Sequence, residues 1–92
     1  MRIAGFEWDD ENEEHVSRHG VVPAETEEVL RLGPYLRRGR LRTYLAYGPT
    51  AEGRLLLVVF RLTTRPGGVA RVITARDLTR REREAWRRRK KR

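Results

Sequence analysis

The sequence predicts an α+β domain with a four-stranded, mostly antiparallel sheet, two N-terminal helices on one face and a C-terminal helix. Three observations favour this class. Helix-like segments with capping signals fill residues 9–33, and strand-like runs separated by turn residues fill 41–76. A chain of 92 residues also encloses only one core. The expected order of elements is β-α-α-β-β-β-α.

The N-terminal segment predicts one strand followed by a helix. In the run RIAGFEW, Phe6 and Trp8 share one parity, which is typical of a short strand with an aromatic face. The acidic residues from Asp9 onward suit the first turn of a helix, and Gly20 suits the C′ position after its end. We therefore expect the first helix within residues 9–20.

Two further helices are predicted on either side of the remaining strands. Pro23 suits the first position of a helix that stops before Gly33, although Val22 is a poor N-cap. TRRE at residues 79–82 has the capping-box spacing and opens the last helix. Residues 87–92 are all basic, and we expect this tail to fray.

The three other strands follow from alternation and turn signals. LRTYLAY at 41–47 alternates, and GPTAEGR at 48–54 is a turn cluster that predicts a hairpin. LLLVVFRL at 55–62 is apolar on both faces, so it should be the central strand, and VARVITAR at 69–76 predicts the last one. Buried residues should include those of the central strand with Phe6, Trp8, Val16 and Leu30.

Charge is strongly segregated along the chain. The net charge is +8, but residues 1–30 hold nine acids and two arginines, whereas residues 31–92 hold 19 bases and four acids. Of the 21 bases 19 are arginine, whose guanidinium binds phosphate through a planar fork and stacks on bases. A heat-adapted genome would also raise the arginine content, but it would not separate the signs. Nucleic acid is therefore the leading partner class.

Several function classes are excluded by what the sequence lacks. It has no cysteine, which rules out disulfides, thiolate zinc sites, iron–sulfur clusters and a cysteine nucleophile. P-loop, GxGxxG, GxSxG and EF-hand patterns are absent. No apolar run approaches the ~18 residues of a membrane span, and the start MRIAGFEWDD lacks the apolar region of a signal peptide. We therefore expect a cytoplasmic protein with no membrane contact.

The two histidines are candidates for chemistry. His15 and His19 are separated by four residues, so they share one face of the predicted helix. HVSRH lacks the glutamate of an HExxH site and has no obvious third ligand, so no metal site is expected. His19, beside Arg18, is either a general acid or base or a histidine that only favours the helix dipole.

Two arginines stand at strand positions where apolar or neutral residues would be expected. Arg61 and Arg76 lie on adjacent predicted strands, where they can converge on one sheet face. There they would clamp a phosphate and stabilise the transition state of phosphodiester cleavage. Alternatively, both side chains lie at strand ends and reach solvent.

Some aromatic side chains are candidates for base stacking, which single-stranded RNA readers use. Trp8 and Phe60 are assigned to the core. Tyr47 and Trp86 remain candidates for RNA contact, and so do the charged residues Arg18, Arg80 and Arg81. The alternative for both aromatic candidates is core packing, the usual role of such residues in small domains.

Four stretches resemble the BrnT family of toxins from type II toxin–antitoxin modules. They are FEWDDENEEHVSRHGV, PAETEEVL, TYLAYGPTAEGRLLLVVF and RVITARDLTRREREAW, which cover nearly the whole chain. The resemblance implies a single RelE-like domain over residues 1–92 and a ribonuclease activity that halts translation without a cofactor. It also implies a BrnA-like ribbon-helix-helix antitoxin, which binds operator DNA in complex with the toxin.

The resemblance further implies which residues form the site. The basic-histidine element of the family matches Arg18 and His19, the strand-terminal arginine matches Arg76, and Arg61 is a looser match. In this mechanism the arginines on the strands neutralise the scissile phosphate while His19 transfers a proton, and a 2′,3′-cyclic phosphate forms. Asn12 lies in a stretch where the family often has a lysine, which indicates a divergent branch.

The expected function is therefore that of a metal-independent endoribonuclease. Two other interpretations stay open. The chain is a non-catalytic nucleic-acid-binding module if the same arginines only hold phosphates. It is an interaction protein if its acidic first third docks a basic partner.

Overall fold

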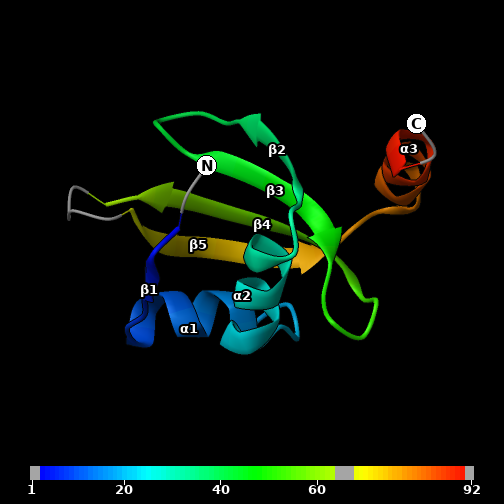
Figure 1. Ribbon diagram of the computed structural model, residues 1–92. Coiled ribbons are helices and arrows are strands. Elements are labelled where there is room, and N and C mark those ends of the chain that lie inside the picture. The colour runs from blue at the N-terminus through cyan, green and yellow to red at the C-terminus, as the bar shows by residue number, and fades with distance from the viewer. Residues whose placement is uncertain (1–2, 64–67, 91–92) are drawn as a thin grey trace.

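The computed structural model describes residues 3–63 and 68–90. Its elements in chain order are β1 (Gly5–Glu7), α1 (Asp10–Ser17), α2 (Pro23–Arg31), β2 (Tyr35–Arg38), β3 (Tyr44–Pro49), β4 (Leu55–Leu62), β5 (Val69–Asp77) and α3 (Arg80–Lys90). The strands form one sheet, with α1 and α2 on the same face and α3 beyond one end (Figure 1). The chain is thus α+β, as the sequence predicts.

The sheet has the strand order β1-β5-β4-β3-β2. β1 runs parallel to β5, and all other neighbours are antiparallel. The prediction of a four-stranded, mostly antiparallel sheet is therefore wrong in its strand number, because β2 is a fifth strand, and the sheet is mixed. β2 is a four-residue edge strand that ends in two arginines, so it lacks the apolar alternation that identifies a strand in a sequence.

β4 is the central strand, as predicted, and it pairs with β3 on one side and β5 on the other. The predicted hairpin between β3 and β4 is also confirmed. However, β3 begins at Tyr44 rather than at residue 41, because Leu41 and Arg42 adopt left-handed backbone conformations with φ of 53° and 63°. Those two residues form a tight turn instead of continuing the strand.

Asn12 ties the first turn of α1 to the sheet. Its side chain accepts the Asp9 N–H at 2.8 Å, and the Asp9 side chain accepts the Asn12 N–H at 3.2 Å, which forms a capping box. The Asn12 amide is buried and donates to the carbonyl oxygens of Glu7 (3.0 Å) and Val72 (2.8 Å). Beyond the helix, Gly20 has φ of 68°, so the predicted stop is confirmed.

The other two helices also begin where local signals predict. The Glu25 carboxylate accepts the Val22 N–H at 3.0 Å, which compensates for the poor N-cap of α2. At α3, Glu82 accepts the Thr79 N–H (2.8 Å) and Thr79 Oγ1 accepts the Glu82 N–H (3.2 Å), so the predicted capping box is present. The helix continues through residues 87–90, which were expected to fray; the last two residues lie outside the described part.

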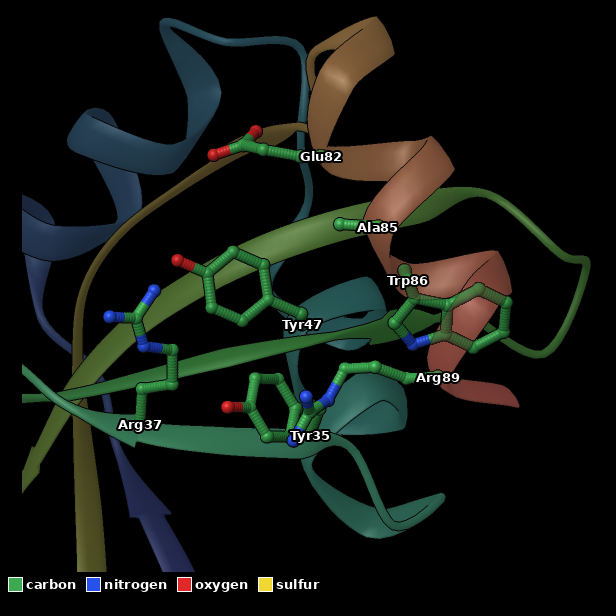
Figure 2. Close-up of a pocket in the computed structure, with 7 residues that line it drawn as sticks. All are labelled: Tyr35, Arg37, Tyr47, Glu82, Ala85, Trp86 and Arg89. Atoms are coloured by element: carbon green, nitrogen blue, oxygen red, sulfur yellow. The ribbon is translucent and has the colours of Figure 1, made fainter. Parts of the chain in front are cut away.

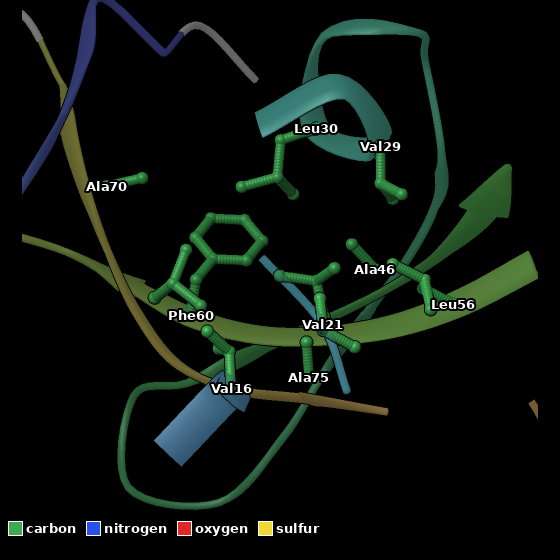
Figure 3. Packing of buried hydrophobic residues seen from close by; sticks show 11 residues of the cluster. Val16, Val21, Val29, Leu30, Ala46, Leu56, Phe60, Ala70 and Ala75 are labelled. Atoms are coloured by element: carbon green, nitrogen blue, oxygen red, sulfur yellow. The ribbon is translucent and has the colours of Figure 1, made fainter. Parts of the chain in front are cut away.

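The core lies between the sheet and the two N-terminal helices. β4 contributes its largest buried side chain, Phe60, while α1 contributes Val16 and α2 contributes Leu30 (Figure 3). Phe6 and Trp8 pack against this cluster but stay partly exposed, so their predicted burial is confirmed only in part. α1 and α2 cover only this face, so the opposite face of the sheet is not covered by either of them.

Candidate nucleic-acid interface

A row of four side chains crosses the face of the sheet opposite α1 and α2. Tyr35 of β2 is in register with Tyr47 of β3. Leu57 of β4 is in register with Tyr47 on one side and with Arg76 of β5 on the other. Directly opposed residues project from the same face of a sheet, and Ala46, beside Tyr47 in the chain, points into the core. The row therefore lies on the outer face.

A groove of about 190 Å³ separates the tyrosine end of this row from α3 (Figure 2). The two tyrosine rings are tilted by 32°, with centroids 6.1 Å apart, and Cζ of Arg89 lies 3.6 Å from the Tyr35 centroid. We call this cavity the Tyr–Trp groove. It is lined by Tyr35, Arg37, Tyr47, Glu82, Ala85, Trp86 and Arg89.

Arg76 anchors α3 to the end of the row. Its Nη1 and Nη2 donate to Glu82 Oε1 (2.7 Å) and Oε2 (3.0 Å), and Nη1 also donates to the Asp77 carbonyl (3.1 Å). These bonds, supported by the Thr79 N–H, lower the pKa of Glu82 to about 2, and the pKa of Arg76 is raised by the same partner. Both groups are therefore charged at neutral pH, and Glu82 is a weak base.

The Tyr–Trp groove has the chemistry of a base-stacking site. Two phenol rings and an indole line the groove, the Arg89 guanidinium already stacks on the Tyr35 ring, and Arg37 adds a second positive charge. The groove, at about 190 Å³, is smaller than the ~300–1,000 Å³ cavities that hold drug-sized ligands, so only a small group can enter it. Proteins bind single-stranded nucleic acid by this combination of stacking rings and guanidinium groups.

The structure brings part of the predicted site together. Tyr47 and Trp86 both line the groove, and Arg76 borders it through its ion pair with α3. Arg80 and Arg81 are exposed in the first turn of the same helix. Three of the predicted residues, Tyr47, Trp86 and Arg76, therefore lie at or beside the groove, whereas Arg80 and Arg81 lie elsewhere on α3 and do not line it.

Arg61 has the strand parity of the outer face, but it lies at the other end of the β4–β5 ladder, where it also lines a cavity with Glu11 and His15 of α1. It is in register with Arg71, whereas Leu57 is in register with Arg76. Four residues therefore separate Arg61 from the Arg76 position, which corresponds to roughly 13 Å along the strand. The Arg61 side chain is exposed and makes no hydrogen bond or ion pair with the described residues. The two predicted arginines share a face without forming a single phosphate clamp.

His19 and Arg18 follow α1 and lie in the helix layer. Both are exposed, and the His19 ring makes no hydrogen bond or ion pair within residues 3–63 and 68–90. Arg54 links this corner to the sheet, because it donates to the Gly20 carbonyl (2.9 Å) and to the Asp77 carboxylate (2.8 and 3.1 Å). The structure therefore does not bring His19 into contact with either predicted arginine.

Arg71 is a cation that the sequence analysis did not single out. Only 15% of its side chain is exposed, and it forms ion pairs with Glu7 (3.3 Å), Asp9 (2.9 Å) and Glu11 (3.2 Å). The hydrogen bonds from Arg71 lower the pKa of Asp9. Arg54 similarly pairs with acids of α2 and β5. Several acids of the first third are thus already paired with the basic part of the same chain.

Tyr35, Arg37 and Arg89 are the aromatic and basic residues of the Tyr–Trp groove that no sequence pattern marks as site candidates. Tyr35 and Arg37 have the same parity in YLRR, and reading this run as an edge strand would have placed both on one face. Arg89 lies in the predicted tail, where no sequence signal distinguishes it from the neighbouring arginines.

Comparisons with known proteins add no identification. No protein-family model matches the chain, and a search of curated proteins finds no match. Among the described residues, no helix is long and apolar enough to cross a membrane, and no group of three or more His, Asp or Glu side chains is arranged to hold a metal ion. The function has to be inferred from the Tyr–Trp groove and the charged surface around it.

Proposed function

We propose that this protein binds single-stranded RNA, with one base stacked in the Tyr–Trp groove and the adjacent phosphates held by arginines. The groove itself carries this proposal, because Tyr47 of β3 and Trp86 of α3 line one cavity that Arg37 and Arg89 also line. Base stacking on aromatic rings contributes about 1–3 kcal/mol per base and tolerates different bases. Binding by stacking and by phosphate contacts alone requires no catalytic group.

The biological role that we propose is that of a cytoplasmic toxin of a type II toxin–antitoxin module, which cleaves RNA and is neutralised by a BrnA-like antitoxin. Two things support it: the resemblance to the BrnT family and the position of Arg76 beside the groove. In this role Arg76 would exchange the Glu82 carboxylate for a phosphate and neutralise it during cleavage. The geometry supports no contact between His19 and the groove, so proton transfer by His19 rests on the resemblance alone.

A non-catalytic RNA-binding module is the second candidate. The bidentate pair between Arg76 and Glu82 favours it, since the arginine is already occupied and the carboxylate, with a pKa of about 2, is a poor proton acceptor at neutral pH. On this view the arginines around the groove hold phosphates without activating them.

One experiment separates these possibilities. Purified protein is incubated with a fluorescently labelled single-stranded RNA in the presence of EDTA, and both anisotropy and RNA length are measured. Binding with intact RNA supports the module, whereas cleavage that leaves 2′,3′-cyclic phosphate ends supports the toxin. Absence of both binding and cleavage would overturn the RNA proposal and favour a protein-interaction role.

A further inference from the structure

The turn between β2 and β3 holds two adjacent non-glycine residues in left-handed backbone conformations. The Thr43 N–H donates to the Arg40 carbonyl at 3.0 Å, which closes the turn. Its two central residues are Leu41, with φ of 53°, and Arg42, with φ of 63°. Positive φ at both central positions defines a type I′ turn, which strongly prefers Asn and Gly. Leucine and arginine are therefore strained at these positions.

The contacts around this turn specify the strained conformation. Thr43 Oγ1 donates a second hydrogen bond, of 2.6 Å, to the Arg40 carbonyl. On the other side, the Gly39 N–H donates to the Thr43 carbonyl at 2.9 Å. A Cβ on Gly39 would collide with Thr43 Oγ1, so a larger residue there would force Thr43 out of the rotamer that bonds the Arg40 carbonyl. A strained residue that its surroundings hold in place is a candidate for a functional role.

Leu41 gains nothing within the fold that would offset its strain. It is 90% exposed, more than the other exposed large apolar residues Val22 (54%) and Leu32 (57%). The side chain does not contribute to the core, and its Cβ is unfavourable at a positive φ. A leucine at this tip is best explained by an apolar contact with a ligand.

Four exposed arginines lie around the tip that carries Leu41. Arg40 and Arg42 are its chain neighbours, Arg61 of β4 lines the same shallow cavity as Leu41 and Arg42, and Arg38 lines a second cavity with Arg42 on the other side of the strand pair. Within the described part of the chain, none of these four side chains forms a hydrogen bond or an ion pair. We call Leu41 and these four arginines the basic turn. Glu7 is the one carboxylate that lines the cavity of Leu41, and the arginines outnumber it, so this excess of positive charge attracts a polyanion.

We propose that the basic turn is a second RNA contact, at which Leu41 inserts against an unstacked base step while the arginines hold the flanking phosphates. This inference rests on the proposed function for the identity of the ligand. Nucleic-acid-binding proteins use apolar side chains as wedges between bases in this way. Six residues along β2 and the turn separate Tyr35 in the groove from Leu41, which corresponds to at most roughly 20 Å, so a few nucleotides can reach both contacts.

The decisive test compares two substitutions of Leu41. Leu41→Asn removes the apolar wedge and relieves backbone strain, so we expect RNA affinity to fall roughly tenfold while Tm rises by about 4 °C or more. Leu41→Met keeps an apolar side chain and the strain, so its affinity and Tm should match the wild type. Leu32→Ala, at an exposed leucine outside both contacts, is the control and should leave RNA affinity unchanged.

The outcomes separate this inference from the proposed function. If the Leu41→Asn variant has a higher Tm but binds RNA as tightly as the wild type, the proposed contact of Leu41 with RNA is overturned. Loss of RNA binding in the Trp86→Ala variant would then still support base stacking in the Tyr–Trp groove. If the wild type binds no RNA, both proposals fail. Poly-L-glutamate serves as a second probe: if its binding depends on Leu41 and RNA binding does not, the turn docks an acidic protein, and the RNA contact is rejected.

Discussion

The Arg76 guanidinium and the Glu82 carboxylate join the end of β5 to the first turn of α3 through two parallel hydrogen bonds of 2.7 and 3.0 Å. The same carboxylate accepts the Thr79 N–H, so one side chain both caps the helix and anchors it. Trp86 and Arg89 follow on the same helix and form one wall of the Tyr–Trp groove. The shape of the groove therefore depends on this ion pair.

Glu82→Gln should weaken the attachment of α3 in a pH-dependent way. The folded-state pKa of Glu82 is lowered to about 2, so its stabilisation is fully present above the ordinary glutamate pKa and is lost as the pH falls towards about 2. The wild type should therefore have a larger unfolding free energy than Glu82→Gln at pH 7, and this difference should decrease below about pH 4.3. Denaturant unfolding at a series of pH values measures it.

The control for this experiment is Glu84→Gln. Glu84 lies on the same helix, half exposed, and its pair with Arg80 is longer, at 3.4 Å. Such a surface pair contributes only about 0–1 kcal/mol, so the variant should differ little from the wild type at any pH. An equal loss of stability in both variants would show that the Arg76–Glu82 pair has no special anchoring role.

Removing one ring from the Tyr–Trp groove should weaken RNA binding. Trp86→Ala and Tyr47→Leu each delete a stacking surface, and we expect roughly 5- to 100-fold lower affinity, the scale of one lost base contact. In a Trp8→Phe background Trp86 is the only tryptophan, so its fluorescence should change when RNA is added. Anisotropy titrations and tryptophan emission provide the two measurements.

Tyr44→Leu is the matched control for the groove variants. Tyr44 lies on β3 with Tyr47, but it points to the helix side, where it stacks on Phe60 with a centroid distance of 5.5 Å. Its substitution should lower stability and leave the RNA affinity of the folded protein unchanged. Equal loss of affinity in the Tyr44 and Tyr47 variants would count against a specific groove.

Arg71→Met should destabilise the fold without affecting the groove. It removes the guanidinium that pairs with Glu7, Asp9 and Glu11, and since each such partly exposed pair contributes about 0–1 kcal/mol, we expect a loss of that scale per pair at pH 7. Since Arg71 lowers the pKa of Asp9, this part of the stabilisation is present above the ordinary aspartate pKa and is lost at lower pH. A loss that stays constant down to pH ~2 would assign the effect to packing rather than charge.

The elements of the fold with local signals could be predicted from the sequence. The capping residues Asp9 and Thr79 mark two helix starts, and the double-sided apolar run of β4 identifies the centre of the sheet. β2 could not be recognised, since a short charged edge strand resembles a loop. The parallel pairing of β1 with β5 could not be predicted either, because it depends on contacts between distant parts of the chain.

The site was predicted residue by residue but not as an assembly. Tyr47 and Trp86 were candidates, yet only the strand register and the anchoring of α3 place them at one groove. Arg61 and Arg76 were expected to converge, and parity does place them on one face, but the β4–β5 register sets them four residues apart. The offset between residues on neighbouring strands depends on how the strands pair, and the sequence pattern does not specify that register.

Substitutions of Arg76 and His19 test the toxin proposal. In a chain that cleaves RNA, Arg76→Ala should lower the cleavage rate by about 10²–10³-fold, the scale of one lost transition-state donor. His19→Ala should leave RNA affinity unchanged, because His19 is exposed and outside the groove. A rate loss of about 10²-fold at unchanged affinity would establish proton transfer by His19, whereas a flat pH–rate profile between pH ~5 and ~8 would argue against it.

Salt dependence provides the last test, because it counts the phosphates that the protein neutralises. For single-stranded nucleic acid the slope of log K against log salt is about −0.7 per phosphate contact. Arg37 lines the Tyr–Trp groove, whereas Arg18 lies at the end of α1 and pairs with Glu14. Arg37→Gln should therefore flatten the slope by about 0.7 and Arg18→Gln should not, and anisotropy titrations between about 50 and 200 mM salt measure both.

The same titrations distinguish RNA from the proposed antitoxin. An antitoxin that silences the chain should cover the outer face around Arg61 and Arg76 and compete with RNA. Because a protein partner also buries apolar surface, its complex should weaken less with salt than the RNA complex. For RNA alone, an equal change in the salt slope of log K for Arg18→Gln and Arg37→Gln would mean that the RNA backbone does not follow the outer face. Equal salt slopes for both partners, or RNA binding that persists in the antitoxin complex, would mean that they do not share this surface.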